Sequence, residues 1–131
     1  KSGIIGTVFT GFEGALEESE HTTPESVDLQ RQLKIMQEAG CKAAVIEVSS
    51  QGIMQRRTDF VDFDLCIFTN MSSDHIGRGE HSSYEEYRYW KTTQKALSWQ
   101  RPSQTGVHPV QKKEKIPALC FSAGVRKQIF A

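Results

Sequence analysis

The sequence predicts an α/β fold in which helices pack against a mostly parallel sheet. Short, almost wholly apolar runs at residues 43–48 and 65–69 are typical of strands buried between helices. Segments with helical periodicity, at residues 24–39 and 83–97, alternate with them. This order favours right-handed crossover connections, and in such sheets ligands bind at the carboxyl ends of the strands.

The first expected element is a strand over residues 3–9, a run of apolar residues and glycines. An acidic, glycine-containing connection follows over residues 11–20. The chain begins directly on this strand and has no initiator methionine. We therefore expect it to be part of a longer protein.

The helix over residues 24–39 has a clear start, a clear apolar face and a clear stop. Thr23 is expected to cap it, and Pro24 suits the first helical position. One apolar stripe is expected from Leu29, Leu33 and Met36. Gly40 supplies the stop.

The two apolar strands are each followed by polar residues. Glu47 lies near the carboxyl end of the strand at 43–48, and Ser49 and Ser50 come directly after it. A polar loop at residues 72–77 follows the strand at 65–69. Because carboxyl ends of parallel strands share one edge of a sheet, we expect these polar residues in one crevice, with Asn70, Asp74 and His75 among them.

The chain changes character after the second helix. Turn-forming and charged residues dominate from residue 98, so we divide the chain into a domain at 1–97 and a divergent tail at 98–131. Residues 116–121 form a candidate last strand. Pro117 would confine that strand to a sheet edge, or lie at its first residues.

Length and composition limit the classes of function. The 131 residues suffice for one domain with one modest core, and 16 basic residues balance 16 acidic ones. No net charge draws the chain to nucleic acid or to an anionic membrane, and no apolar run reaches the ~20 residues needed to span a bilayer. The three cysteines, Cys41, Cys66 and Cys120, fit neither a disulfide framework nor a CxxC metal pair, so we predict reduced thiols and a cytoplasmic protein.

Two residues are candidates for binding a cation. A carboxylate at the mouth of a buried strand, such as Glu47, suits Mg²⁺, although a helix cap or a salt bridge to Lys42 or an arginine would also explain it. His75 could bind metal or phosphate from its loop, or be merely solvated. We interpret His21 and His81 as solvated histidines.

Cationic and hydroxyl side chains supply further candidates. Arg56 and Arg57 offer positive charge and a planar fork that matches phosphate or carboxylate, unless they are only two surface arginines. Thr22 and Thr23 could form an anion site at a helix start, or act only as caps. Lys91 lies in an aromatic helix segment, where an amine withdrawn from water can lose its proton and do covalent chemistry; the alternative is an exposed ammonium.

Three segments taken together resemble the central domain of the Mur ligases. They are residues 22–30 (TTPESVDLQ), 47–51 (EVSSQ) and 68–75 (FTNMSSDH), and the resemblance extends over residues 3–97. It is strongest to the tripeptide synthetase branch, which adds the third residue of the peptidoglycan stem. The implied fold is a three-layer α/β domain like that of P-loop NTPases. It is incomplete here, because no G-x-x-x-x-G-K-[ST] loop occurs.

The resemblance also implies roles for particular residues. Those matching contacts to the UDP-N-acetylmuramoyl-peptide are Thr22, Thr23, Ser49, Gln55 and Arg57. Glu47 and His75 match magnesium ligands, and Lys91 matches a lysine that CO₂ carbamylates. ATP is the implied co-substrate, but no residue of this chain matches its phosphate loop. The family's N-terminal UDP-binding domain and its C-terminal domain are also not matched.

The implied reaction is amide ligation, in which ATP phosphorylates the substrate carboxylate and an amine then attacks the acyl phosphate. We expect the isolated chain to be inactive. The sequence departs from the family pattern at His21, where Asn is common, and at Gln51, where His is usual. Two alternatives remain open: a relative of folylpolyglutamate synthase or cyanophycin synthetase, or a non-catalytic module that binds UDP-muramyl peptide.

Overall fold

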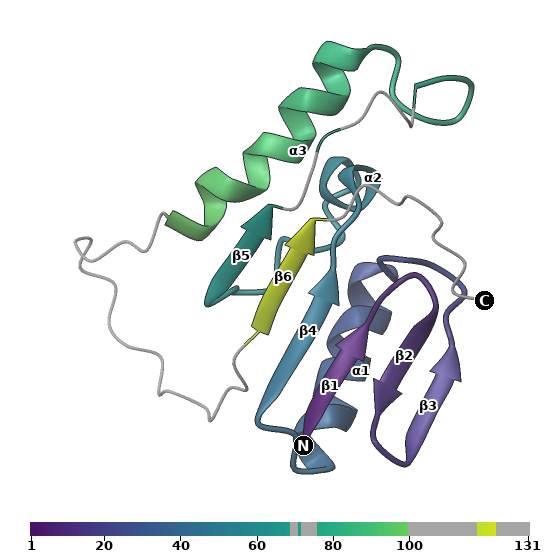
Figure 1. The fold of residues 1–131 in the computed structure, drawn as a ribbon, viewed down its shortest axis with the longest axis vertical. Helices are drawn as coiled ribbons and strands as arrows, with labels where there is room; N and C mark the ends of the chain where they lie inside the picture. The colour runs from purple at the N-terminus through teal and green to yellow at the C-terminus, as the bar shows by residue number, and fades with distance from the viewer. Residues whose placement is uncertain (69–70, 72–75, 100–117, 123–131) are drawn as a thin grey trace.

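The computed structural model describes residues 1–68, 71, 76–99 and 118–122 (Figure 1). These residues form one six-stranded sheet in the order β3-β2-β1-β4-β6-β5, with three helices. In chain order the elements are β1 (Ser2–Ile5), β2 (Phe9–Phe12), β3 (Ala15–Glu18), α1 (Ser26–Glu38), β4 (Ala43–Glu47), α2 (Ser50–Met54), β5 (Leu65–Phe68), α3 (Tyr84–Trp99) and β6 (Ala118–Ser122).

The sheet is mixed, with a parallel part and an antiparallel hairpin. Strands β1, β4, β6 and β5 are parallel neighbours, and in Figure 1 their arrowheads all point toward the end of the sheet where α2 lies. The register sets Ile5 opposite Ile46, and Cys66 opposite Cys120. The α/β class and the parallel alignment of these strands agree with the expectation from the sequence.

The hairpin corrects the prediction for the first twenty residues. The expected strand at 3–9 ends at Ile5, because the chain turns and the Gly6 amide donates to the Phe9 carbonyl at 3.1 Å. The segment expected to be a connection, 11–20, instead belongs largely to β2 and β3, which pair antiparallel. Its glycines made it look like a loop, but Gly14 serves the tight turn, at a φ of 86°.

Helix α1 confirms the predicted apolar face and stop but not the predicted start. Leu29 and Met36 are fully buried, and Gly40 follows the helix at a φ of 79°. The helix begins at Ser26 with Glu25 as its N-cap residue, and no side chain caps it. The Thr23 cap is therefore wrong, since that hydroxyl bonds to the loop after β4 instead.

The core lies between α1 and one face of β1 and β4, and Figure 1 shows α1 behind these strands. Its buried members are Ile5, Leu29, Met36, Cys41, Ala44, Ile46, Val48 and Ile53. Gly3 permits this close packing, because a Cβ there would lie 2.3 Å from the Met36 sulfur.

Helix α2 was not anticipated, because five residues are too few to show helical periodicity. Ser49 caps it by accepting from the Gly52 amide at 3.0 Å. Helix α3 agrees with the expected helix at 83–97 within two residues. It packs against α2 and β5.

The last two strands differ from expectation in position. β5 was expected to be buried on both faces, yet three of its four residues are exposed, since it lies at the end of the strand order. β6 lies between β4 and β5, so the alternative of an edge strand is wrong; Pro117 immediately precedes it in the sequence. Among the described residues, no helix is long and apolar enough to cross a membrane.

Candidate functional site

A cavity of about 450 Å³ lies where β4 ends and α2 begins. It is lined by Glu20, His21, Thr22, Thr23, Glu47, Ser49, Ser50, Gln51, Arg57, Glu80 and Lys91. Six of the residues predicted for the site are among them, and they come from the segment before α1, the end of β4, both ends of α2 and the middle of α3.

Two predicted site residues are not among the residues lining this cavity. Gln55 is exposed at the end of α2. His75 lies outside the described residues, as do Asn70 and Asp74.

Thr23 fastens the segment before α1 to the loop after β4. Its buried hydroxyl accepts from the Ser49 amide at 3.0 Å and lies 3.1 Å from the Glu47 carbonyl, to which it donates. Gly52 leaves room for this contact, since a Cβ there would lie 2.9 Å from the Thr23 side chain. Thr23 thus orders two walls of the cavity.

Ser49 presents a hydrogen-bond donor at the cavity wall. Its oxygen accepts from the Gly52 amide at 3.0 Å, and the Thr23 hydroxyl, whose single proton is donated to the Glu47 carbonyl, lies 3.3 Å away. The Ser49 proton can therefore point to an acceptor, either Thr23 or an atom of a ligand.

Glu47 is held by the end of β1. Its Oε2 accepts from the Thr7 amide at 2.9 Å and from the Thr7 hydroxyl at 2.8 Å. Ser49 rather than Glu47 caps α2, and the ion pairs found in the described part of the chain do not include Glu47. Within the described residues, Glu47 is therefore held by Thr7 and neither caps a helix nor forms a salt bridge.

Arg57 is a partly buried arginine that braces the cavity. One terminal nitrogen donates to the Thr23 carbonyl at 2.7 Å, and the other lies 2.7 Å from the Glu25 carboxylate. Its side chain is only 18% exposed, which excludes a simple surface role. Its Nε is buried and has no hydrogen-bond partner among the described residues.

Lys91 lies inside the protein. It is 2% exposed, and its Nζ lies 5.8 Å from the centre of the Tyr87 ring. The alternative of an exposed ammonium is therefore wrong.

His81 was missed by the sequence analysis. It is fully buried, and its Nε2 lies 2.8 Å from the hydroxyl of Ser50, a cavity residue. The expectation of a solvated side chain is wrong for His81 but holds for His21, which is exposed. No sequence pattern could reveal the pair, because its members are 31 residues apart.

The donor set can be compared with the needs of a divalent cation. The described part of the chain contains no cluster of three His, Cys, Asp or Glu residues suited to a metal. Mg²⁺ usually keeps several waters and takes one or two carboxylates together with substrate phosphates. A carboxylate such as Glu47 in a polar cavity fits Mg²⁺ in that form.

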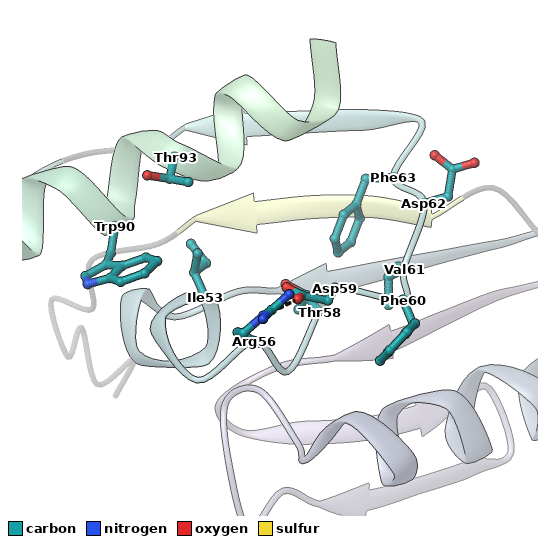
Figure 2. Close-up of a pocket in the computed structure, with 10 residues that line it drawn as sticks. All are labelled: Ile53, Arg56, Thr58, Asp59, Phe60, Val61, Asp62, Phe63, Trp90 and Thr93. Carbon is teal, nitrogen blue, oxygen red and sulfur yellow. Dashed lines mark hydrogen bonds and ion pairs between the residues drawn. The ribbon is translucent and has the colours of Figure 1, made fainter. Parts of the chain in front are cut away.

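A second cavity, of about 720 Å³, contains none of the predicted site residues (Figure 2). Ile53 of α2 and Trp90 of α3 lie on one side of it, and the segment 58–63 lies on the other. Arg56 and Asp59, which both line it, pair at 2.6 Å. Its wall is more apolar than that of the polar cavity, and no titratable cluster points to chemistry there.

The structure defines an α/β protein with a polar cavity at the carboxyl end of a parallel strand, the edge of such sheets at which ligands commonly bind. The family model of the Mur ligase middle domain matches residues 1–114. This chain belongs to the Mur ligase family. The resemblance found in the sequence is thereby confirmed.

Several curated proteins are similar to most of this chain. Three of them are named UDP-N-acetylmuramoyl-L-alanyl-D-glutamate--2,6-diaminopimelate ligase. The one from Ectopseudomonas mendocina is 43% identical over 99 residues, which is 76% of this chain and 20% of that protein. The one from Coxiella burnetii is 41% identical over 108 residues, which is 82% of this chain and 21% of that protein. The one from Neisseria meningitidis serogroup A is 46% identical over 87 residues, which is 66% of this chain and 17% of that protein. The chain spans about a fifth of the length of these relatives.

Proposed function

We propose that this chain supplies substrate- and metal-binding residues of an ATP-dependent ligase that joins an amino acid to UDP-N-acetylmuramoyl-dipeptide. The observation that supports this most is the assembly of Thr22, Thr23, Glu47, Ser49, Arg57 and Lys91 around one cavity. The names of the relatives support 2,6-diaminopimelate as the amino acid. Peptidoglycan precursor synthesis in the cytoplasm is the corresponding setting.

The cavity offers complementary groups to such a substrate. Arg57 and Ser49 are donors suited to a carboxylate or phosphate, and Thr22 and Thr23 line the cavity from the segment before α1. Gln55 is proposed as a further substrate contact at the end of α2. Glu47, with His75, would hold Mg²⁺, which when bound neutralises charge that develops on transferred phosphoryl groups.

Lys91 is proposed to be carbamylated. The Lys91 ammonium would first lose one proton, and the resulting neutral amine would then form an N–C bond to CO₂ and release a second proton, so that a cation becomes a carboxylate-like anion. Lys91 is buried in the lining of the cavity, so a carbamate formed there would be shielded from bulk water. The anion would add a second negative group to the wall that contains Glu47.

ATP would bind at a three-layer P-loop NTPase-like core, and the complete ligase would include UDP-binding and amino-acid-selecting domains. None of the 131 residues forms a G-x-x-x-x-G-K-[ST] loop. We therefore propose that this chain binds UDP-muramyl peptide without turnover. The identity of its relatives as ligases of this branch weighs against a folylpolyglutamate synthase-like activity.

The test is calorimetric binding of UDP-N-acetylmuramoyl-L-alanyl-D-glutamate to the purified chain, beside a complete ligase from one of the relatives. Arg57→Ala should weaken binding about 10-fold or more, because a charge-assisted donor is lost. Arg31→Ala is the matched control, since Arg31 pairs with Asp28 on the exposed side of α1.

Two results would contradict this function. One is failure of the chain to bind a ligand that the complete ligase binds, and the other is equal loss of affinity in both variants. ATP hydrolysis with Mg²⁺ and bicarbonate is measured in parallel. Turnover by the chain would overturn the proposal of binding without catalysis.

A further inference from the structure

We infer that Thr7 is a positioning residue that orients the Glu47 carboxylate and the Thr22 hydroxyl as acceptors for a divalent cation. This inference rests on the proposed function, because it assigns to Thr7 a role in the metal site proposed around Glu47. Thr7 follows β1 and is not among the residues that line the cavity. It acts through its neighbours.

Two hydrogen bonds from Thr7 converge on a single oxygen. The amide and the hydroxyl of Thr7 donate to Glu47 Oε2 at 2.9 and 2.8 Å. A carboxylate held at one oxygen by two donors loses its rotational freedom. Its other oxygen then has a fixed direction, as supporting partners of metal ligands provide.

The same hydroxyl also determines the direction of the Thr22 proton. Thr7 Oγ1 and Thr22 Oγ1 lie 3.1 Å apart, and either could donate on distance alone. A hydroxyl has one proton, and that of Thr7 is used by Glu47. Thr22 must therefore donate to Thr7, which leaves lone pairs on the Thr22 oxygen for the cavity.

The result is a hydrogen-bond chain from Thr22 through Thr7 to Glu47. Its two ends, Thr22 and Glu47, line the cavity and present oxygen lone pairs to it. Hard cations such as Mg²⁺ prefer such oxygen ligands. Gly6 contributes space, because a Cβ at that position would lie 3.3 Å from Glu47 Oε2. The end of β1 is thus shaped around this carboxylate.

The test uses Mn²⁺ as a paramagnetic substitute for Mg²⁺ and reads the broadening of assigned amide signals in the whole chain. In the unaltered protein, signals of Gly6 and Val48 should broaden at lower Mn²⁺ than those around Glu38, an exposed carboxylate on α1. In Thr7→Val the concentration for half-broadening should rise about 10-fold. Thr7→Ser, which keeps the hydroxyl, should restore the original response, and Glu47→Gln should abolish the preference.

Each failure has a distinct pattern. Equal broadening around Glu38 and Glu47 in the unaltered protein would contradict the proposed metal site itself, and with it the role of Thr7. If signals near Glu47 broaden first in the unaltered protein and do so at the same Mn²⁺ concentration in Thr7→Val, only the inference about Thr7 is overturned. Thr7 is exposed, so Thr7→Val should not disturb the core. An otherwise unchanged spectrum of this variant establishes that the fold is retained.

Discussion

Single side chains join the walls of the polar cavity, and Arg57 joins the residues after α2 to the segment before α1. It bonds to the backbone of Thr23 and to the carboxylate of Glu25, both in the segment before α1, from its own place after α2. A guanidinium does this with two nitrogens of one plane, whereas an ammonium is a single point of charge. The geometry of the group therefore matters as much as its charge.

Arg57→Lys should for this reason behave as a damaging change. We expect the free energy of unfolding to fall by about 1–2 kcal/mol, because one hydrogen bond to a buried carbonyl is lost. Urea denaturation measures this, with Arg31→Lys on the exposed side of α1 as the control. Equal stability of Arg57→Lys and the unaltered chain would show that charge alone suffices.

Residue types predicted part of this site and could not predict the rest. A carboxylate at a strand end and a lysine among aromatics made Glu47 and Lys91 candidates, and the three family motifs taken together assigned their roles. Thr7 and His81 are ordinary residues in the sequence. Their importance arises from partners 40 and 31 positions away, which only the tertiary fold brings near.

At the scale of elements, two helices end in the same way with different residues. The amides of Gly40 and Cys41 close the end of α1 on Gln37 and Met36, and those of Arg56 and Arg57 close α2 in the same pattern. This is the Schellman arrangement, whose first residue after the cap adopts positive φ. Gly40 does so without strain, but Arg56 has a side chain at a φ of 60°.

Replacing Arg56 should therefore separate backbone strain from side-chain contacts. Arg56→Gly and Arg56→Ala both remove the pair with Asp59, but only glycine relieves the left-handed backbone. We expect the glycine variant to be more stable than the alanine variant by about 1 kcal/mol. Thermal unfolding of the two variants measures the difference, and equal stability would contradict strain at this position.

The start of α3 is stabilised by its own side chains. Ser83 accepts from the Glu86 amide at 3.1 Å, and Glu86 in turn accepts from the amide and the hydroxyl of Ser82. The hydrogen bonds from the Ser82 hydroxyl and amide lower the pKa of Glu86 below its ordinary value. The sequence Ser83-x-x-Glu86 has the spacing of a capping box.

This carboxylate makes stability depend on pH in a defined direction. Because the pKa of Glu86 is lower in the folded chain, its contribution is fully present above the ordinary pKa of glutamate and is lost as the pH falls through the folded value. Glu86→Gln should slightly lower the thermal midpoint at about pH 7 and much less at about pH 3. A difference independent of pH would contradict this role.

In the whole molecule, the central position of β6 determines whether the sheet is continuous. The strand nearest the end of the chain lies between β4 and β5, and it is the strand that joins them. The sequence predicted the separate strands and the class of the fold. It could not predict this order, because strand pairing depends on contacts between distant residues that no local pattern encodes.

Removal of β6 should consequently do more harm than removal of the residues after it. A chain ending at Trp99 lacks the strand, whereas a chain ending at Ser122 keeps it. We expect the shorter chain to aggregate, because two strand edges become unpaired, and the longer one to remain monodisperse. Size-exclusion chromatography and thermal unfolding compare them, and equal behaviour would show that β6 is dispensable.

The central place of β6 also has a consequence for the order in which the sheet can form. Synthesis proceeds from the N-terminus, so β4 and β5 leave the ribosome before β6, the strand that pairs with both of them. Each of the two earlier strands then has an unpaired edge until residues 118–122 emerge. The parallel part of the sheet can therefore be completed only after residue 122 has been added.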